Sequence, residues 1–323
     1  MLELLQGPLL ISLLAAMVRI ATPLLFSAMG ELVTQRAGIW NIAVEGTMLI
    51  GAIVAYMVAS TTGSPWLALA IAILACAASS LIMSFVTIVL KAEQFVAGLA
   101  LNLLASGVTL FWFQAYIGGR EAPTFIGFDQ VPIPYLSDIP ILGPVLFSQR
   151  LLTYVSFLVP ILVWFFLYRT KYGLEVRCVG ENPKALDVKG LHVGLRQCLA
   201  IMFGSMMSGF GGAFLMLGYS DKFVPDLIAG RGWLVVVAII AGNWMPFRIV
   251  GAIFIFAFLE ALGIHAQVVG IPVPHQLFLV LPYVASLVLL AGLRRAPISP
   301  WRSAFPTTGN RPCCSTRRAE RLC

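Results

Sequence analysis

The stretch RTKYGLEVRCVGENPKALDVKGLHVGLR, residues 169–196, is the longest polar interruption between strongly apolar segments of this chain. Asn182 and Pro183 suit a helix start, because an Asn side chain can accept a hydrogen bond from a first-turn amide and Pro needs no amide proton there. Gly190 suits the helix end. The helix between them has about seven residues and a length of roughly 10 Å. It is too short to stand alone in water, so we expect it to dock on another structure.

Composition assigns the rest of the chain to a membrane. Hydrophobic residues make up 59% of the chain and charged residues 11%, and the mean hydropathy is +0.93. Apolar runs long enough to cross a bilayer recur along the chain, so we predict an all-α polytopic bundle with about eight or nine spanning or broken segments. The basic residues cluster beside these runs, which explains the net charge of +7 without nucleic acid. The six Cys show no spacing typical of a metal site or a disulfide framework.

The apolar runs define one transmembrane domain, residues 1–295, followed by a basic tail, residues 296–323, that we expect to be disordered in the cytoplasm. We expect spans or broken spans at residues 9–29, 47–59, 66–90, 94–116, 151–168, 198–217, 233–242, 249–264 and 277–293. The sixth of these carries closely spaced small residues that let helices approach one another, namely Ser205, Ser208, Gly209, Gly211 and Gly212. Residues 117–150 are rich in Pro and Gly and poor in basic residues, which predicts an external loop.

Polar residues interrupt the first half of the chain. The segment GELVTQRAGIWNIAVEG, residues 30–46, is too polar for lipid and too apolar for an ordinary loop, which predicts irregular backbone buried in protein. Asn41 and Glu45 in it either satisfy neighbouring backbone groups or line a path for a solute. Arg19 lies at mid-span depth, so it should face protein or a water-filled cavity, with Glu31 and Glu45 as plausible partners.

Two further polar sites lie in or beside later spans. Gln94 and Asn102 are eight residues apart, so both can face one side of a helix, either as structural amides or as a polar lining. The run that begins at Trp233 is short and ends at NWMP, which indicates a broken pair of helices of the kind that often marks a substrate route. Glu260 lies inside the next run, where an ionisable group indicates a functional site or a bond to a neighbouring helix.

Several of these motifs resemble one family. Gly180-Glu181-Asn182-Pro183-x-Ala185, with Gly190 five residues later, resembles a signature of permease subunits of ABC importers for simple sugars and nucleosides, although Leu186 replaces the second Ala of that signature. The segments GELVTQRAGIWNIAVEG and QFVAGLALNLLA resemble two other blocks of the family. Asn243 stands where the family usually has Arg. The resemblance covers roughly residues 23–295 and is greatest to the shorter of two paired nucleoside permeases.

The resemblance implies a function in which the short helix is a coupling helix that sits in a groove of a separate ATPase subunit. The residues expected to couple are Gly180, Glu181, Asn182, Pro183, Ala185 and Gly190, and the residues expected to line the path are Asn41, Glu45, Gln94, Asn102, Trp233 and Glu260. The implied partners are the ATPase, a second homologous permease, an external substrate-binding protein and the lipid bilayer, with no cofactor. The expected substrates are nucleosides or related small sugars, carried across the plasma membrane.

Other classes of function fit the sequence less well. No P-loop motif occurs, so the chain must take its energy from elsewhere and is not itself an enzyme. A secondary transporter driven by an ion gradient, with Arg19, Glu45 and Glu260 as a charge relay, is the alternative, and neighbouring genes for an ATPase and a receptor would argue against it. The sequence leaves open the substrate, a homodimer or heterodimer, and whether the tail RPCCSTRRAERLC reflects a shifted reading frame.

Basic residues orient the chain. If the N-terminus is outside and about nine segments cross the bilayer, Arg36, Lys91, Arg248 and the basic residues of the loop 169–196 and of the tail lie inside. Arg120, Arg150, Lys222 and Arg231 lie outside. Because cytoplasmic loops carry the excess of Lys and Arg, this distribution supports that orientation.

We therefore expect Lys184 and Lys189 to be cytoplasmic and Glu121 and Asp138 to be external. Single cysteines at these positions, in a cysteine-free background, can be exposed to an impermeant thiol reagent in intact cells. Labelling at positions 121 and 138 and protection at 184 and 189 are the expected results. Labelling of position 184 from outside would show that the topology is inverted.

Overall fold

The structure is a computed structural model that describes residues 7–117, 125, 127–131, 143–220, 223–224, 227–268 and 275–292. Over these residues the chain folds into helices and forms no strand. In chain order the elements are α1 (Gly7–Arg36), α2 (Val44–Thr62), α3 (Pro65–Ser84), the π-helical turn η2 (Phe85–Val89), α4 (Gln94–Ile117), the π-helical turn η3 (Gly143–Phe147), α5 (Leu151–Arg169), α6 (Lys171–Glu181), α7 (Pro183–Asp187), α8 (Val193–Tyr219), α9 (Arg231–Ala241), α10 (Pro246–Val268) and α11 (His275–Gly292).

The helices confirm the predicted polytopic bundle. In the described part of the chain, seven helices are long and apolar enough to cross a membrane: α1, α2, α3 with η2, α4, α5, α8 and α10. The shorter α9 has 11 residues, so its length of roughly 16 Å covers about half of a hydrocarbon core of about 30 Å. The broken pair predicted around NWMP is therefore confirmed as a short α9 followed by a full-length α10.

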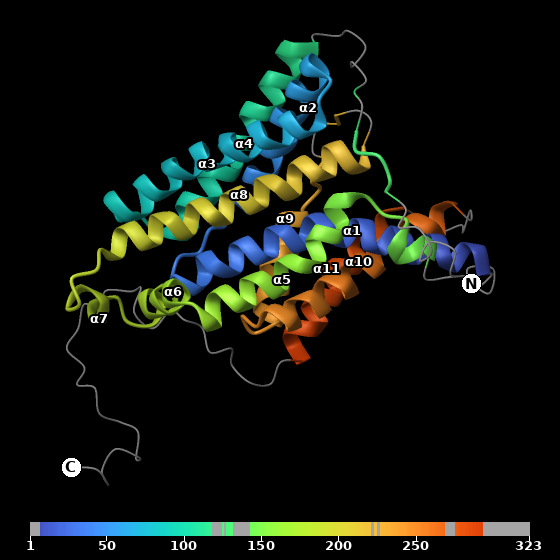
Figure 1. Ribbon diagram of the computed structural model, residues 1–323. Coiled ribbons are helices and arrows are strands. Elements are labelled where there is room, and N and C mark those ends of the chain that lie inside the picture. Colours follow the sequence, from blue (N-terminus) through green and yellow to red (C-terminus); the bar gives the residue numbers. More distant parts are fainter. Residues whose placement is uncertain are drawn as a thin grey trace.

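Two helices form the centre of the bundle. Figure 1 shows α1 and α8 side by side, with α2, α3 and α4 beyond α8 and with α5, α10 and α11 on the other side of α1. The helix α8 can approach α1, α2 and α3 closely because small residues cover its inner faces, as predicted. Those residues, Ser205, Ser208, Gly209, Gly211 and Gly212, are all buried.

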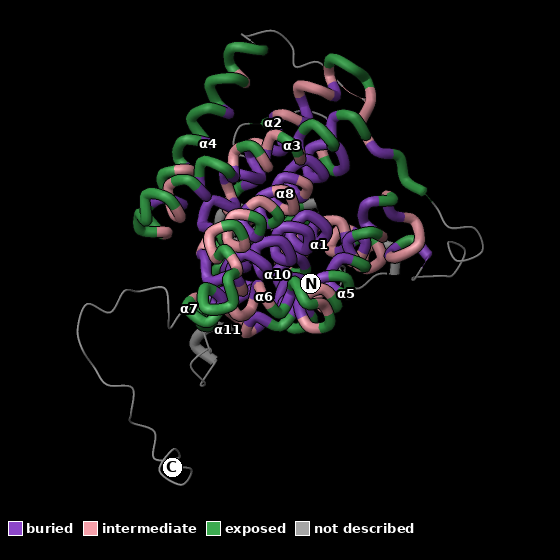
Figure 2. Tube along the Cα trace, turned by 60° about the vertical axis from the view of Figure 1, so that its left-hand side comes forward, coloured by how far each residue is buried: buried purple, intermediate pink, exposed green. Residues whose placement is uncertain are grey.

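Burial falls from this centre outward. Figure 2 shows buried residues concentrated along α1 and α8, whereas α4 is exposed over most of its length. The outward face of α4 is apolar: Leu103 is 69% exposed and Phe111 is 67% exposed. Such an apolar outer face is stable in a lipid bilayer, because lipid tails are as apolar as these side chains.

One predicted boundary was wrong. We expected irregular backbone from Gly30 to Gly46, but α1 continues as a helix to Arg36 and only residues 37–43 leave the helical conformation. The polar side chains of the last turns, among them Glu31 and Gln35, are buried against protein and never meet lipid. The polar residues at the end of α1 therefore indicate that protein, and not lipid, surrounds the helix there. They do not indicate a change of backbone conformation.

Some predicted features lie outside the described residues. These are the tail at 296–323, most of the external loop at 117–150 with Glu121 and Asp138, and Lys222. The two helices α6 and α7 are described, and they lie at the end of the bundle opposite the beginning of α1 (Figure 1). This arrangement places the loop 169–196 at the end of the bundle where α1 also terminates.

Candidate functional site

The loop 169–196 contains two helices. The first, α6, was not predicted, because we expected only the short helix between Asn182 and Gly190 in this loop. Thr170 caps it, since its hydroxyl accepts a hydrogen bond from the Gly173 N–H at 3.1 Å. Val176 and Val179 are buried on one face of α6. The capping Thr and this apolar spacing were the sequence signals that could have predicted the helix.

The second helix, α7, is the predicted short helix, and it begins at Pro183 as expected. Its capping differs from the prediction, because the Asn182 side chain makes no capping bond and the Asn182 N–H instead donates to the Cys178 carbonyl at 2.8 Å. Gly190 ends the turn as predicted: its φ is +73°, and its N–H donates to the Asp187 carbonyl at 2.9 Å. This part of the loop therefore has a defined conformation maintained by its own backbone.

The outer surface of this loop is free of contacts with the rest of the bundle. Glu181, Asn182, Ala185 and Gly190 are exposed, and Val188 is 90% exposed. Leu186, which replaces the second Ala of the signature, is buried at 4% exposure and anchors α7 to the bundle. An exposed turn with a projecting apolar side chain is suited to contact with another protein.

Gly180 faces the opposite way. It is buried against the end of α1, where a Cβ atom on Gly38 would lie only 3.0 Å from the Gly180 Cα. A Cβ atom on Gly180 would collide with the Arg36 carbonyl. The two backbones are therefore in direct contact. Within the GENP motif, Gly180 faces the bundle, whereas Glu181 and Asn182 are exposed.

Side chains of α4 fix the irregular segment 37–43. The Gln94 Oε1 accepts a hydrogen bond from the Trp40 N–H at 2.9 Å. The Asn102 amide spans the start of α2, because its Oδ1 accepts from the Gly46 N–H at 2.7 Å and its Nδ2 donates to the Ile42 carbonyl at 2.8 Å. Both amides therefore face the same side of α4, as predicted. These hydrogen bonds agree with the structural alternative, in which the Gln94 and Asn102 amides satisfy backbone groups of another segment.

Asn41 adjoins a cavity. Its N–H donates to the Glu31 Oε1 at 3.2 Å, and its Oδ1 accepts from the Ala43 N–H at 3.3 Å. Its Nδ2 is buried without a hydrogen-bond partner among the described residues. Asn41 lines a cavity of about 180 Å³ whose other polar wall residues are Thr47, Ser79, Ser80 and Ser205. Of the predicted path residues, Asn41 is the one that lines this cavity, and its Nδ2 is left for a polar solute or water.

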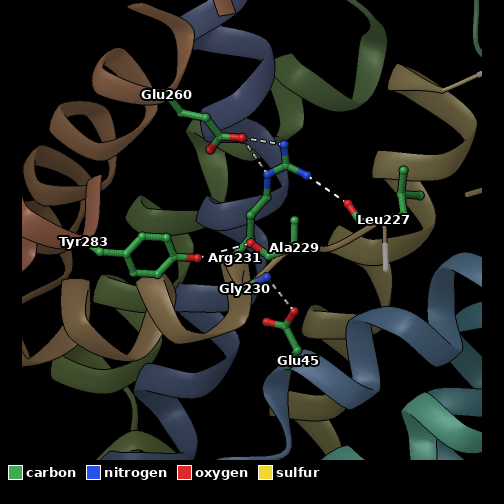
Figure 3. A network of polar contacts seen from close by, with 7 residues as sticks. All are labelled: Glu45, Leu227, Ala229, Gly230, Arg231, Glu260 and Tyr283. Atoms are coloured by element: carbon green, nitrogen blue, oxygen red, sulfur yellow. Dashed lines mark hydrogen bonds and ion pairs between the residues drawn. The ribbon is translucent and has the colours of Figure 1, made fainter. Parts of the chain in front are cut away.

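Glu45 holds the beginning of α9 (Figure 3). Its Oε1 accepts a hydrogen bond from the Gly230 N–H at 2.8 Å. Its Oε2 accepts a hydrogen bond from the Gly232 N–H at 2.7 Å. The first amides of a helix carry a partial positive charge, which a carboxylate neutralises. Since α9 is short and buried, this carboxylate occupies the position at which an anion would otherwise bind.

Arg231 and Glu260 form an ion pair beside this carboxylate (Figure 3). The Arg231 Nε donates to the Glu260 Oε1 at 2.9 Å, and its Nη2 donates to the same oxygen. Its Nη1 donates to the Leu227 carbonyl at 3.1 Å. The Tyr283 hydroxyl donates to the Ala229 carbonyl at 3.1 Å and thereby attaches α11 to the same turn. Glu45 and Glu260 are thus both engaged in holding α9.

One expectation about a side chain was wrong. Arg19 pairs with neither Glu31 nor Glu45; it lines a small cavity with Tyr219 and Arg231, and its Nε has no hydrogen-bond partner among the described residues. Trp233, which we expected to line the path, is 39% exposed and does not line the cavity beside Asn41. Its role in the path stays a prediction.

The chain resembles several known proteins over most of its length. The family described as "Branched-chain amino acid transport system / permease component" matches residues 13–291. A putative glucose ABC transporter permease of Haloferax volcanii is 37% identical over 79% of this chain and 78% of its own length. The guanosine ABC transporter permease NupQ of Bacillus subtilis is 31% identical over 88% of this chain and 93% of its own length.

A nucleoside ABC transporter permease of Lactococcus lactis is 32% identical over 89% of this chain and 94% of its own length. No solved structure gives a significant match. The matching region of the family includes both the exposed loop and the polar segments around α9.

The ion pair at α9 predicts a non-additive response to mutation. The Arg231 and Glu260 side chains are 14% and 16% exposed. Arg231→Leu should destabilise the protein by about 3–5 kcal/mol, because it leaves an uncompensated buried carboxylate. Arg231→Leu combined with Glu260→Leu should recover most of that loss. Thermal unfolding in detergent micelles measures both, and equal losses in the single and double variants would contradict the assigned pairing.

Proposed function

Because the chain belongs to the family of permease components of branched-chain amino acid transport systems, we propose that it forms part of a path for nucleosides that is coupled to ATP hydrolysis through residues 180–190. Family membership and the relatives make the chain a membrane-spanning permease subunit of an ABC importer, with multiple spans in the plasma membrane. ATP is hydrolysed on a separate subunit. The alternative of an autonomous transporter driven by an ion gradient is thereby set aside.

The exposed loop supports the coupling role. Glu181, Asn182, Ala185 and Gly190 face solvent, whereas Leu186 and Gly180 attach the loop to the bundle. Because the loop is exposed on one side and attached to the bundle on the other, movement of a partner bound to the exposed side can be transmitted to the membrane domain. This arrangement is the observation on which the proposed coupling rests.

The neutralised start of α9 supports an uncharged substrate. Discontinuous helices of transporters often direct their positive N-termini at anionic substrate groups. Here the Glu45 carboxylate already binds the Gly230 and Gly232 amides, so no fixed positive end is left for an anion. A neutral solute rich in hydrogen-bonding groups suits this environment better, and nucleosides and simple sugars both have that character.

Nucleosides are our preferred substrate class. The guanosine and nucleoside permeases align with this chain over 93% and 94% of their length, against 78% for the putative glucose permease. The glucose permease has the higher identity at 37%, so a simple sugar is the second candidate. Asn41 would supply the free amide, with Gln94, Asn102, Glu45 and Glu260 shaping the backbone around it and Trp233 facing outward.

The proposed assembly has three kinds of partner. Family membership implies an ATPase subunit and a second permease subunit, and both guanosine permeases of B. subtilis resemble this chain, NupP with 25% identity over 70% of it. A homologous partner would make the pair a heterodimer. We further propose an external substrate-binding protein that meets the predicted external loop at residues 117–150.

Gly190→Pro tests the coupling role. Pro cannot adopt the φ of +73° found at Gly190 and removes the N–H that donates to the Asp187 carbonyl. We expect the assembled transporter to lose stimulation of ATP hydrolysis by substrate and receptor, while the subunit remains in the membrane. Glu181→Arg changes only an exposed side chain and should have the same effect with less risk to folding.

Gly63→Pro is the matched control. Gly63 also has a positive φ, at +67°, and its N–H donates to a helix carbonyl, Ala59 O, at 2.9 Å. No atom lies within 4 Å of a Cβ built on either glycine. Gly63→Pro should therefore preserve stimulation. If well-inserted Gly190→Pro and Glu181→Arg assemblies are stimulated like the wild type, the coupling role is refuted.

Uptake of radiolabelled nucleosides by the complete assembly tests the substrate. We expect guanosine or adenosine to be carried and Asn102→Leu to reduce uptake severalfold without loss of membrane insertion, because the Gly46 N–H and the Ile42 carbonyl lose their partner. Leu103→Ala, at a side chain 69% exposed on the same helix, should leave uptake unchanged. Uptake of ribose or glucose without any nucleoside would exclude the nucleoside proposal and leave the importer assignment intact.

A further inference from the structure

The last turn of α1 contacts two elements that are far apart in sequence. On one side it meets the end of α6, immediately before the exposed loop. On the other side it meets the turn between α9 and α10, residues 242–245. Both contacts involve Arg36 or its nearest neighbours, so one short piece of helix lies between the coupling loop and the broken helix pair.

The contact with the coupling loop is made by backbone. Gly180 lies against Arg36 and Gly38, and no side chain on either glycine separates the chains. Glu181 and Asn182 follow directly and lead into α7. A displacement of α7 toward the bundle would therefore press on the end of α1 without being absorbed by flexible side chains.

The contact with the α9–α10 turn is made by hydrogen bonds. The Arg36 Nη2 donates to the Trp244 carbonyl at 2.8 Å and to the Tyr168 hydroxyl at 3.3 Å. The Trp244 Nε1 donates in return to the Gln35 Oε1 at 2.8 Å. The Gln35 amide donates to the Glu31 Oε1 at 3.0 Å, the same oxygen that binds the Asn41 N–H.

The turn itself has an unusual backbone. Asn243 and Trp244 both have positive φ, +51° and +52°, a conformation that residues other than glycine rarely adopt. Such a conformation persists where the surroundings impose it. Trp244 is 2% exposed, so its ring and its bonds to Gln35 and Arg36 are the surroundings that hold this turn.

The opposite end of α9 is held independently by Glu45. The helix is thus fixed at its start by a carboxylate of α2 and at its end by the last turn of α1. A shift of α1 relative to α2 would move the two attachments apart and reorient α9. The contacts thus form a continuous series of packed backbone and hydrogen bonds from the loop surface to the broken helix.

We propose that Arg36 is a positioning residue that transmits movement of the coupling loop to the α9–α10 turn, and so to the broken helix beside the path. The proposal rests on the coupling role proposed above for residues 180–190. Arg36 touches neither ATP nor the transported solute; it acts through Trp244. Without its bonds, the ATPase cycle would continue while α9 no longer follows it.

The test measures solute transported per ATP hydrolysed in the reconstituted assembly. Arg36→Met keeps the length of the side chain but cannot donate a hydrogen bond, and we expect the ratio to fall by about tenfold while ATP hydrolysis persists. Arg36→Lys keeps a charged donor and should restore most of the ratio. Arg248→Met removes an exposed cation close to the same turn and should behave as the wild type.

Trp244→Phe provides a second variant if Arg36→Met does not assemble. It removes the Nε1 donor to Gln35 and keeps an aromatic ring and the carbonyl that Arg36 binds, so a smaller fall in the same ratio is expected. A wild-type ratio in Arg36→Met, or in Trp244→Phe where the first variant is lost, would overturn the proposal. A loss of stability with an unchanged ratio would also overturn it, because Arg36 would then be only a brace.

Failure of this proposal is distinct from failure of the coupling role. The coupling role fails if Gly190→Pro and Glu181→Arg assemblies respond like the wild type, whatever Arg36→Met does. If those loop variants lose stimulation and Arg36→Met transports normally, the loop couples by another route and only the role of Arg36 is refuted.

Discussion

The structure depends on one constraint: backbone that leaves a helix inside a membrane must find its hydrogen bonds within the protein. Residues 37–43 and the start of α9 are two places in the described chain where buried backbone leaves a helix and needs partners from other helices. The first is met by Gln94 and Asn102 of α4, and the second by Glu45 of α2. These bonds explain why polar residues persist in a chain whose outer surface is apolar, and they link α1, α2, α4 and α9 into one unit.

The same bonds support the proposal that the transported solute is uncharged. Glu45 occupies the positive end of α9, and Glu260 neutralises Arg231, so both carboxylates are engaged at the start of this helix. The path proposed above would therefore offer polar groups there and no free helix end for an anion.

The bundle, the broken pair at α9 and α10 and the turn before Gly190 could be predicted from the sequence. They depend on the length and hydropathy of the apolar runs and on the position of glycine, which are local properties of the chain. Prediction from the sequence failed where a conformation or a partner depends on residues that are distant in the sequence. The helix α1 runs to Arg36 because protein, and not lipid, covers Glu31 and Gln35. Arg19 lacks the predicted carboxylate partners, because Glu45 accepts from two backbone amides and Glu31 accepts from the Gln35 side chain and the Asn41 N–H. The bond between Arg36 and Trp244 joins residues 208 positions apart, a distance at which no local pattern is informative.

We propose that the loop around Val188 meets an ATPase subunit on the cytoplasmic side. Val188 is 90% exposed, so a photoreactive amino acid at this position would touch whatever binds there. Irradiation of membranes that contain the complete assembly should give a covalent adduct of this chain with the ATPase subunit, and the same residue placed at exposed Thr61 should not. An adduct with the ATPase from position 61, or none from position 188 in an assembly that transports, would contradict the account.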